Sequence, residues 1–131
     1  MPFFNFAALQ NAFGRIEENA RSYERALSQL AESGKALSLD AQKKLDQTLI
    51  QTERALLRSE GLPRRPWYKH LIYAPGFYTG YGVKTLPGVR EAIEERNWNE
   101  AEEQIAIAAK ALERCGDEIS KATALVRDAS K

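Results

Sequence analysis

The chain has 131 residues, and its 19 Lys and Arg nearly balance its 18 Asp and Glu, so the net charge is close to zero. This balance gives no global basic field for nucleic acid or for an anionic membrane, and no recognised nucleic-acid-binding motif occurs. One cysteine, Cys115, excludes an internal disulfide, and one cysteine with one histidine makes a self-contained zinc site improbable. We therefore expect one domain, with no metal, no nucleic-acid partner and no membrane contact from this segment.

Apolar residues recur in the first thirty positions with the spacing of one helical face. The seam consists of Phe6, Leu9, Phe13, Ile16, Ala20, Tyr23, Leu27 and Leu30. Gly34 is placed as a helix stop and Ser38 as the next N-cap. The pattern predicts a helix over about residues 3–33, and the short linker predicts that the next helix runs back antiparallel to it.

A second helix is expected over about residues 38–59, before Gly61 and Pro63 end it. Its apolar stripe is wide enough for a helix that touches two neighbours. The stripe consists of Leu45, Leu49, Thr52 and Leu56 on one face, with Ile50 and Leu57 beside them.

Two more helices are expected after a long connection. Pro87 suits the first turn of a short helix over about 88–96, and Asn97 with Glu100 has the form of a capping box for a long helix over about 98–128. The seam of the long helix is Trp98, Ala101, Ile105, Ala108, Leu112, Cys115, Ile119, Ala122 and Val126. The sequence thus predicts an all-α, four-helix-bundle-like domain of three long helices and one short helix over residues 1–131.

Such regular seams are also compatible with a coiled coil. Helices joined by tight turns usually pack on each other first, so we favour the intramolecular bundle. Small residues at Ala108, Ala109 and Ala111 would also let a further helix approach closely, including one from a second copy.

The connection over residues 61–87 differs from the rest of the chain. Helix connections in bundles usually take about 2–8 residues, and ordered loops much longer than that tend to be functional. The stretch "RRPWYKHLIYAPGFYTGYG" holds half of the aromatic residues and the only histidine, and it has no acidic residue. It is rich enough in aromatic and branched residues for a short extended segment, although a helical bundle offers such a segment no sheet partner.

Two interpretations of this connection follow from its composition. A loop rich in donors and without carboxylates suits an anionic group, but the same residues would also cap one end of a bundle, which composition alone favours. Arg64 and Arg65 would correspondingly bind phosphate or pair with the acid-rich stretch 91–103, and we favour the pairing.

No side chain forms a recognisable catalytic constellation. His70 has no acidic residue within its loop and is predicted to be a structural hydrogen-bonding residue. Cys115 and Trp98 lie on the apolar seam of the last helix and are predicted to be core residues. The adjacent pairs Glu94-Glu95 and Glu102-Glu103 point to different sides of their helices and are predicted to be solvated.

The segment "GLPRRPWYKHLIYAPGFYTGYGVKTLPGVREAI", followed by "EEQIAIAAKAL", resembles the transferrin receptor-like dimerisation domain. This is the C-terminal helical domain of the glutamate carboxypeptidase and transferrin receptor family. The order of helices and loop matches over essentially the whole chain, and "RPWYKHLIYAP" is more similar to the peptidase branch than to the receptor branch.

The resemblance implies a larger parent chain with an apical domain and a peptidase domain that carries two zinc ions. The present chain would have no catalytic residue and would act in two ways, by forming the homodimer interface and by lending its loop to the pocket that binds a peptide C-terminus. The alternative is a receptor-like, protein-binding domain of a catalytically inactive family member. Family members usually face the outside of the cytoplasm, although "MPFFNFAALQ" lacks the features of a signal peptide.

The resemblance also assigns substrate-binding positions in the loop. In glutamate-specific members, adjacent Lys and Tyr residues after "YAP" hold the carboxylates of a C-terminal glutamate. A count without gaps places Gly80 at the lysine position and Tyr81 at the tyrosine position, so the tyrosine is kept and the lysine is lost. Lys84, three residues downstream, and His70 are further candidates for contact with the substrate.

Overall fold

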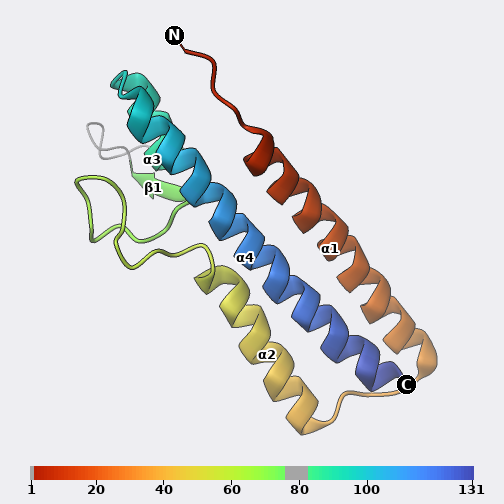
Figure 1. Ribbon diagram of the computed structural model, residues 1–131. Coiled ribbons are helices and arrows are strands. Elements are labelled where there is room, and N and C mark those ends of the chain that lie inside the picture. The colour runs from red at the N-terminus through yellow and green to blue at the C-terminus, as the bar shows by residue number, and fades with distance from the viewer. Residues whose placement is uncertain (1, 76–82) are drawn as a thin grey trace.

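The computed structural model describes residues 2–75 and 83–131. Four helices make up most of the described chain, and its one sheet consists of two short strands, so the prediction of an all-α fold is confirmed (Figure 1). The elements in chain order are α1 (Ala7–Ser33), α2 (Leu39–Arg54), β1 (Tyr73–Pro75), β2 (Val83–Thr85), α3 (Pro87–Glu94) and α4 (Trp98–Ser130).

Three of the predicted helix boundaries are confirmed, those at Gly34, Ser38 and Asn97. Gly34 ends α1 with a left-handed φ of 70°. The Ser38 hydroxyl accepts the Ala41 N–H at 3.1 Å, and the Asn97 side chain accepts the Glu100 N–H at 3.3 Å. Each acceptor satisfies a backbone donor that the first turn of a helix leaves without an intrahelical partner.

The long C-terminal helix α4 lies between the other two long helices. Helices α1 and α2 each pack along α4 and not along each other (Figure 1). As a result α4 buries residues along most of its length, from Ala101 to Val126, whereas Leu45 is the buried residue of α2. The wide stripe predicted for α2 is therefore partly solvent-exposed, because α4 is the helix with two long neighbours; Leu49 and Ile50 are 40% and 52% exposed.

The seam predicted for α1 is wrong in part. The buried residues of α1 are Leu9, Ala12, Ala26 and Leu30, while Phe6, Phe13 and Leu27 are 36%, 46% and 38% exposed. The exposed members recur at seven-residue multiples along one flank of the buried stripe. Since α1 packs against α4 and not against α2, the side of α1 that carries this flank has no long helix beside it.

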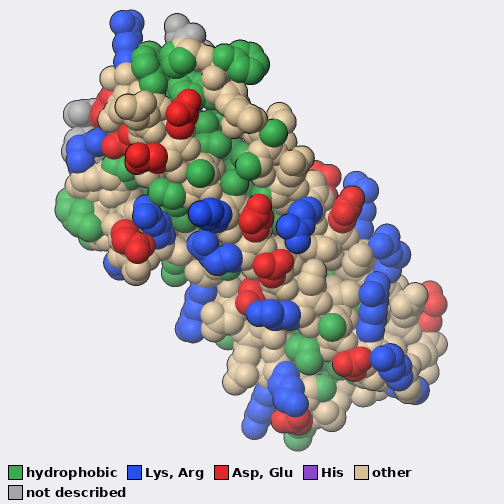
Figure 2. Space-filling view, viewed as in Figure 1, with side chains coloured by type: hydrophobic (Ala, Val, Ile, Leu, Met, Phe, Trp, Pro, Cys, Tyr) green, Lys and Arg blue, Asp and Glu red, His purple; other side chains and the backbone are tan. Residues whose placement is uncertain are grey.

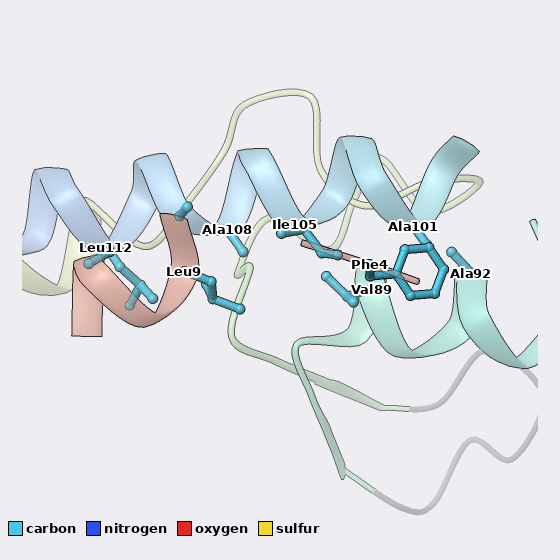
Figure 3. Packing of buried hydrophobic residues seen from close by; sticks show 10 residues of the cluster. Phe4, Leu9, Val89, Ala92, Ala101, Ile105, Ala108 and Leu112 are labelled. Atoms are coloured by element: carbon cyan, nitrogen blue, oxygen red, sulfur yellow. The ribbon is translucent and has the colours of Figure 1, made fainter. Parts of the chain in front are cut away.

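The main core lies where α1, α3 and α4 meet, at the end of the molecule that carries the long connection. Phe4 packs here with Val89 and Ala92 of α3 and Ala101 of α4 (Figure 3). Trp98 lies partly buried against this cluster, with its ring centroid 6.0 Å from that of Phe4, which confirms its predicted core position. A second cluster at the opposite end joins α1, α2 and α4.

Helix α2 ends at Arg54, five residues before the predicted end. The backbone that follows exchanges helical hydrogen bonds for bonds to the long connection. The Leu71 N–H donates to Leu56 O at 2.9 Å, and the Arg58 N–H donates to Lys69 O at 2.8 Å. Residues 56–58 thus have partners outside the helix, which removes the need to continue it.

Charged side chains of both signs are interspersed along the face shown in Figure 2, and apolar side chains gather at the end that carries α3 and the start of the chain. This face therefore presents no extended patch of one sign. Within residues 2–75 and 83–131, no helix is both long enough and apolar enough to cross a lipid bilayer.

Candidate functional site

The long connection begins with a compact base that packs on α4. Leu62, Leu71 and Ala74 form a buried cluster with Ala111 of α4, and Tyr68 packs against its edge. Backbone bonds close the turn over this cluster, since the Leu62 N–H donates to Tyr68 O at 3.0 Å. The small side chain of Ala111, predicted to admit a neighbour, thus admits the chain's own loop and not a further helix.

Gly61 makes the tight turn of this base possible. Its φ is +70°, and a Cβ at this position would lie 2.5 Å from Pro66 O and 2.7 Å from Pro66 Cα. The obstacle is backbone, which cannot rotate away as a flexible side chain would. Any other residue would therefore have to open the turn.

The second half of the connection is a β-hairpin. Strand β1 pairs antiparallel with β2, with Tyr73 opposite Thr85 and Ala74 opposite Lys84. The prediction that an extended segment would find no sheet partner is therefore wrong, because the partner comes from the same connection. Residues 76–82 join the two strands, and Gly80 and Tyr81, the positions assigned to the substrate, lie outside the described residues.

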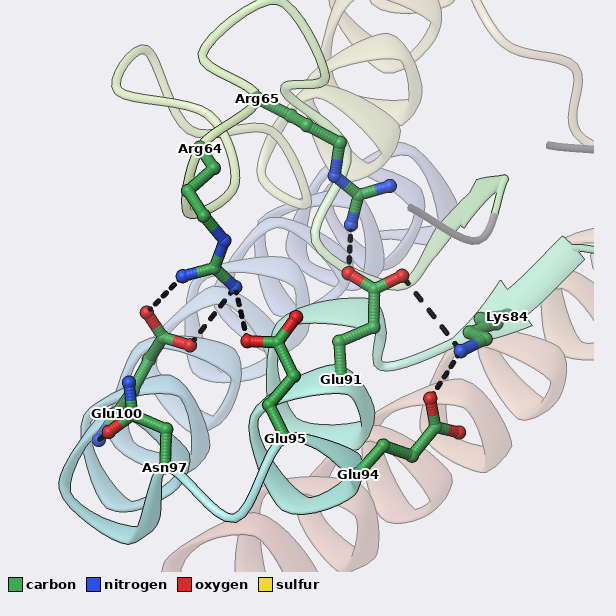
Figure 4. A network of polar contacts seen from close by, with 8 residues as sticks. All are labelled: Arg64, Arg65, Lys84, Glu91, Glu94, Glu95, Asn97 and Glu100. Atoms are coloured by element: carbon green, nitrogen blue, oxygen red, sulfur yellow. Dashed lines mark hydrogen bonds and ion pairs between the residues drawn. The ribbon is translucent and has the colours of Figure 1, made fainter. Parts of the chain in front are cut away.

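Two arginines hold the base of the connection against α3 and the start of α4. Arg64 forms ion pairs with Glu100 at 3.0 Å and with Glu95 at 3.2 Å (Figure 4). Arg65 forms an ion pair with Glu91, and the two side chains are 3% and 6% exposed. The pairing of these arginines with the acid-rich stretch 91–103 is therefore confirmed.

Lys84 lies on β2 and is directed at α3. Its ammonium contacts the Glu94 carboxylate and lies 4.0 Å from Glu91 Oε1 (Figure 4). Sequence reasoning marked the acid-rich stretch as a whole, but it did not single out Glu91. The available signal was the helical spacing of that stretch, which sets Glu91 on the same side of α3 as Glu94 and Glu95.

His70 has hydrogen-bond partners at both ring nitrogens. Nδ1 accepts the N–H groups of Ile72 and Tyr73, each at 3.2 Å, and Nε2 lies 3.0 Å from Glu53 Oε1. The two backbone donors require the neutral ring to carry its proton on Nε2, which then donates to Glu53. The predicted structural role of His70 is therefore confirmed, and its acidic partner comes from α2 and not from its own loop. Contact between His70 and a substrate stays a prediction.

Cys115 is a buried residue of α4, as predicted. Burial raises the pKa of its thiol above the usual value, and the negative charge of Glu53 adds to the effect. Both causes disfavour the thiolate that a nucleophile needs. Glu94, Glu95, Glu102 and Glu103 are all exposed, as predicted.

The described part of the chain contains no group of three or more His, Cys, Asp or Glu side chains arranged to hold a metal ion. Its acidic side chains at the connection are instead paired with Arg64, Arg65 and Lys84.

The chain belongs to the transferrin receptor-like dimerisation domain family, whose model matches residues 4–120. The match covers α1, the long connection and α3, and most of α4. The resemblance read from the loop motif is thereby confirmed.

Curated relatives include two proteins named "probable glutamate carboxypeptidase". One, from Arabidopsis thaliana, is 34% identical over 67% of this chain, and the other, from Arthroderma benhamiae, is 42% identical over 45% of it. A protein of Schizosaccharomyces pombe named an inactive zinc metalloprotease is 27% identical over 87% of this chain. The matched regions make up 15%, 8% and 14% of these three relatives, so the chain corresponds to a small part of each.

Proposed function

We propose that this chain is the non-catalytic dimerisation domain of a glutamate carboxypeptidase-like zinc exopeptidase, and that its hairpin contributes to the wall of the substrate pocket. The observation that carries the proposal is the family match over residues 4–120. In this proposal the two zinc ions belong to the parent's peptidase domain, which faces the outside of the cytoplasm. A zinc ion there would polarise the scissile carbonyl and activate water, and the chain described here would bind and orient.

The exposed apolar residues of the long helices support the dimerisation role. Phe13 and Leu27 of α1 and Leu49 and Ile50 of α2 are each more than a third exposed, although their positions follow the apolar helical pattern. Large apolar side chains that remain in water at such positions are typical of surfaces covered by another subunit or domain.

The full-length parent is expected to have the mass of a homodimer in light scattering. The double variant Leu49→Ser/Ile50→Ser should weaken that dimer by about tenfold or more, because two apolar side chains would no longer be buried in the interface. Gln47→Ser, an exposed position on the same helix, is the matched control and should leave the dimer unchanged. A monomeric parent would contradict dimerisation, and an undisturbed dimer of the double variant would contradict a role for this face of α2.

The hairpin supports the pocket role through its construction. A connection far longer than a bundle requires is bound at its base to α3 and α4, and its second half contains two paired strands. In the proposed pocket the Tyr81 hydroxyl would donate a hydrogen bond to the α-carboxylate that every peptide C-terminus carries. Because Gly80 replaces the lysine, a second, side-chain carboxylate would lack its ammonium partner.

We therefore expect the parent enzyme to lack a strict preference for C-terminal glutamate. An unpaired buried carboxylate costs at least about 1–3 kcal/mol, which corresponds to about tenfold to a hundredfold in kcat/KM. The measurement compares hydrolysis of peptides that end in Glu, Leu or Ala, and Gly80→Lys should raise the preference for Glu. Lys84 is a potential substitute for the missing lysine, but its ammonium already contacts Glu94. A strong preference of the unmodified enzyme for Glu would refute this prediction.

The second candidate function is a receptor-like, protein-binding domain, and the relative named an inactive zinc metalloprotease favours it. Zinc ligands in the parent's peptidase domain would support the exopeptidase, and their replacement would support the receptor-like role.

A further inference from the structure

Glu91 occupies an unusual position for a carboxylate. It lies on α3, whose neighbouring residues Val89 and Ala92 are buried in the main core, so its backbone is fixed by packing on both sides along the helix. Its side chain is only 6% exposed and is turned toward the long connection (Figure 4). A buried charge is retained at such a position only when opposite charges compensate it.

The two oxygens of this carboxylate meet cations from two separate segments of the long connection. Oε2 contacts the guanidinium of Arg65, which precedes β1 in the chain, and Oε1 lies 4.0 Å from the ammonium of Lys84, which belongs to β2 (Figure 4). Glu91, whose helix is fixed by packing, therefore links the segment before β1, through Arg65, to strand β2, through Lys84.

We propose that Glu91 is the positioning residue of the hairpin, and that its ion pairs with Arg65 and Lys84 fix strands β1 and β2 relative to α3 and α4. The consequence for substrate binding rests on the pocket role proposed above. Glu91 itself touches no substrate in this proposal. It acts through Arg65 and Lys84.

The surrounding contacts explain why Glu91, and not a neighbouring acid, has this role. Glu95 pairs with Arg64, whose side chain is 41% exposed, and such exposed pairs contribute little. Glu94 pairs with Lys84 but is 50% exposed and has a second cationic neighbour, Arg90. Without the Glu91 charge, Lys84 would pair with the exposed Glu94 alone. Strand β2 would then lose its link to the segment that carries Arg65.

The experiment replaces Glu91 by Gln in the full-length parent and measures amide hydrogen exchange over residues 72–74 and 83–86. The backbone bonds of the hairpin report directly on its position, including the Leu86 N–H that donates to Ile72 O at 2.8 Å. Exchange of these amides is expected to be at least about tenfold faster in Glu91→Gln. Glu95→Gln, at the residue that directly follows α3, is the matched control and should leave exchange unchanged, while Glu91→Asp, which keeps the charge, should recover part of the protection.

Kinetics on the same variants separate this inference from the proposed function. Glu91→Gln should raise KM for peptide substrates by about tenfold with little change in kcat, because a displaced hairpin loses ground-state and transition-state binding equally. Faster exchange without any change in KM would keep the positioning role and overturn the pocket role. Unchanged exchange in Glu91→Gln would overturn the positioning role itself.

A further variant covers failure of Glu91→Gln to fold. Lys84→Gln removes the ion pairs of Lys84 with Glu91 and Glu94 but leaves the buried pair of Arg65 and Glu91 in place, so the fold should tolerate the substitution. Exchange is then expected to rise over residues 83–86 and to stay unchanged over the base at residues 62–68. If Lys84→Gln left the exchange rates of residues 83–86 unchanged, the proposal would be overturned.

Discussion

Gly61→Ala is expected to lower the free energy of unfolding by about 2–5 kcal/mol. About 1–2 kcal/mol of this comes from placing a side chain at a φ of +70°, where the Cβ approaches the backbone. A further 1–3 kcal/mol, roughly, comes from forcing the new Cβ against the Pro66 carbonyl, since overpacked sites shift the backbone to relieve the overlap. Urea denaturation followed by circular dichroism measures the loss.

Gly34→Ala is the matched control for this prediction. Gly34 has the same φ of +70°, but nothing lies within 4 Å of the position that its Cβ would occupy. Its replacement should therefore cost the conformational strain alone, about 1–2 kcal/mol. Equal losses at the two glycines would show that the contact with Pro66 is relieved without cost, contrary to this interpretation.

The buried pair of Arg65 and Glu91 is expected to give the second large effect. Arg65→Met should destabilise the chain by about 3 kcal/mol or more, because the Glu91 carboxylate would remain buried without its guanidinium partner. The double variant Arg65→Met/Glu91→Leu should be more stable than the sum of the single losses predicts, by about 1–3 kcal/mol, since it removes both charges together. The four denaturation curves form a double-mutant cycle.

Arg64→Met is the control for the charge itself. Arg64 is the adjacent residue and also pairs with acidic side chains, but it is 41% exposed, so its loss should cost less than about 1 kcal/mol. If Arg64→Met and Arg65→Met lowered the free energy of unfolding by similar amounts, burial would not distinguish the two pairs. If the losses in the double-mutant cycle were additive, Arg65 and Glu91 would act independently.

Much of the fold could be read from short-range sequence signals. Gly34, Ser38 and Asn97 mark helix ends through interactions with residues a few positions away, and such local geometry is encoded locally. The pairing of Arg64 and Arg65 with residues 91–103 was also predictable, because the loop holds cations without anions and the stretch 91–103 is rich in Glu.

The arrangement of the helices was less accessible. A seam with regular spacing shows that a helix has an apolar face, but it does not show how many neighbours cover that face. Phe13 and Leu27 follow the same pattern as Leu30, yet they remain exposed because α1 packs against α4 and not α2. That outcome depends on where α2 lies, which is a long-range property.

The candidate site shows the same limit. The aromatic and branched residues of β1 indicated an extended segment, but its pairing with β2 joins residues that lie on either side of 76–82. The early end of α2 has a similar cause, because residues 56–58 bond to residues 69–71 across the loop. In both cases the partner becomes visible only when the chain is folded. The role of Glu91 was missed for the same reason.

The central place of α4 has a consequence for biosynthesis. Because α1 and α2 pack along α4 and not along each other, neither has a long helix to pack along until residues 98–130 have left the ribosome. The chain is therefore expected to stay without its core through most of its translation, with Phe13, Leu27 and the rest of both apolar stripes exposed, and to collapse in one late step. Early chaperone protection would matter more for this chain than for one whose helices dock in the order of their synthesis.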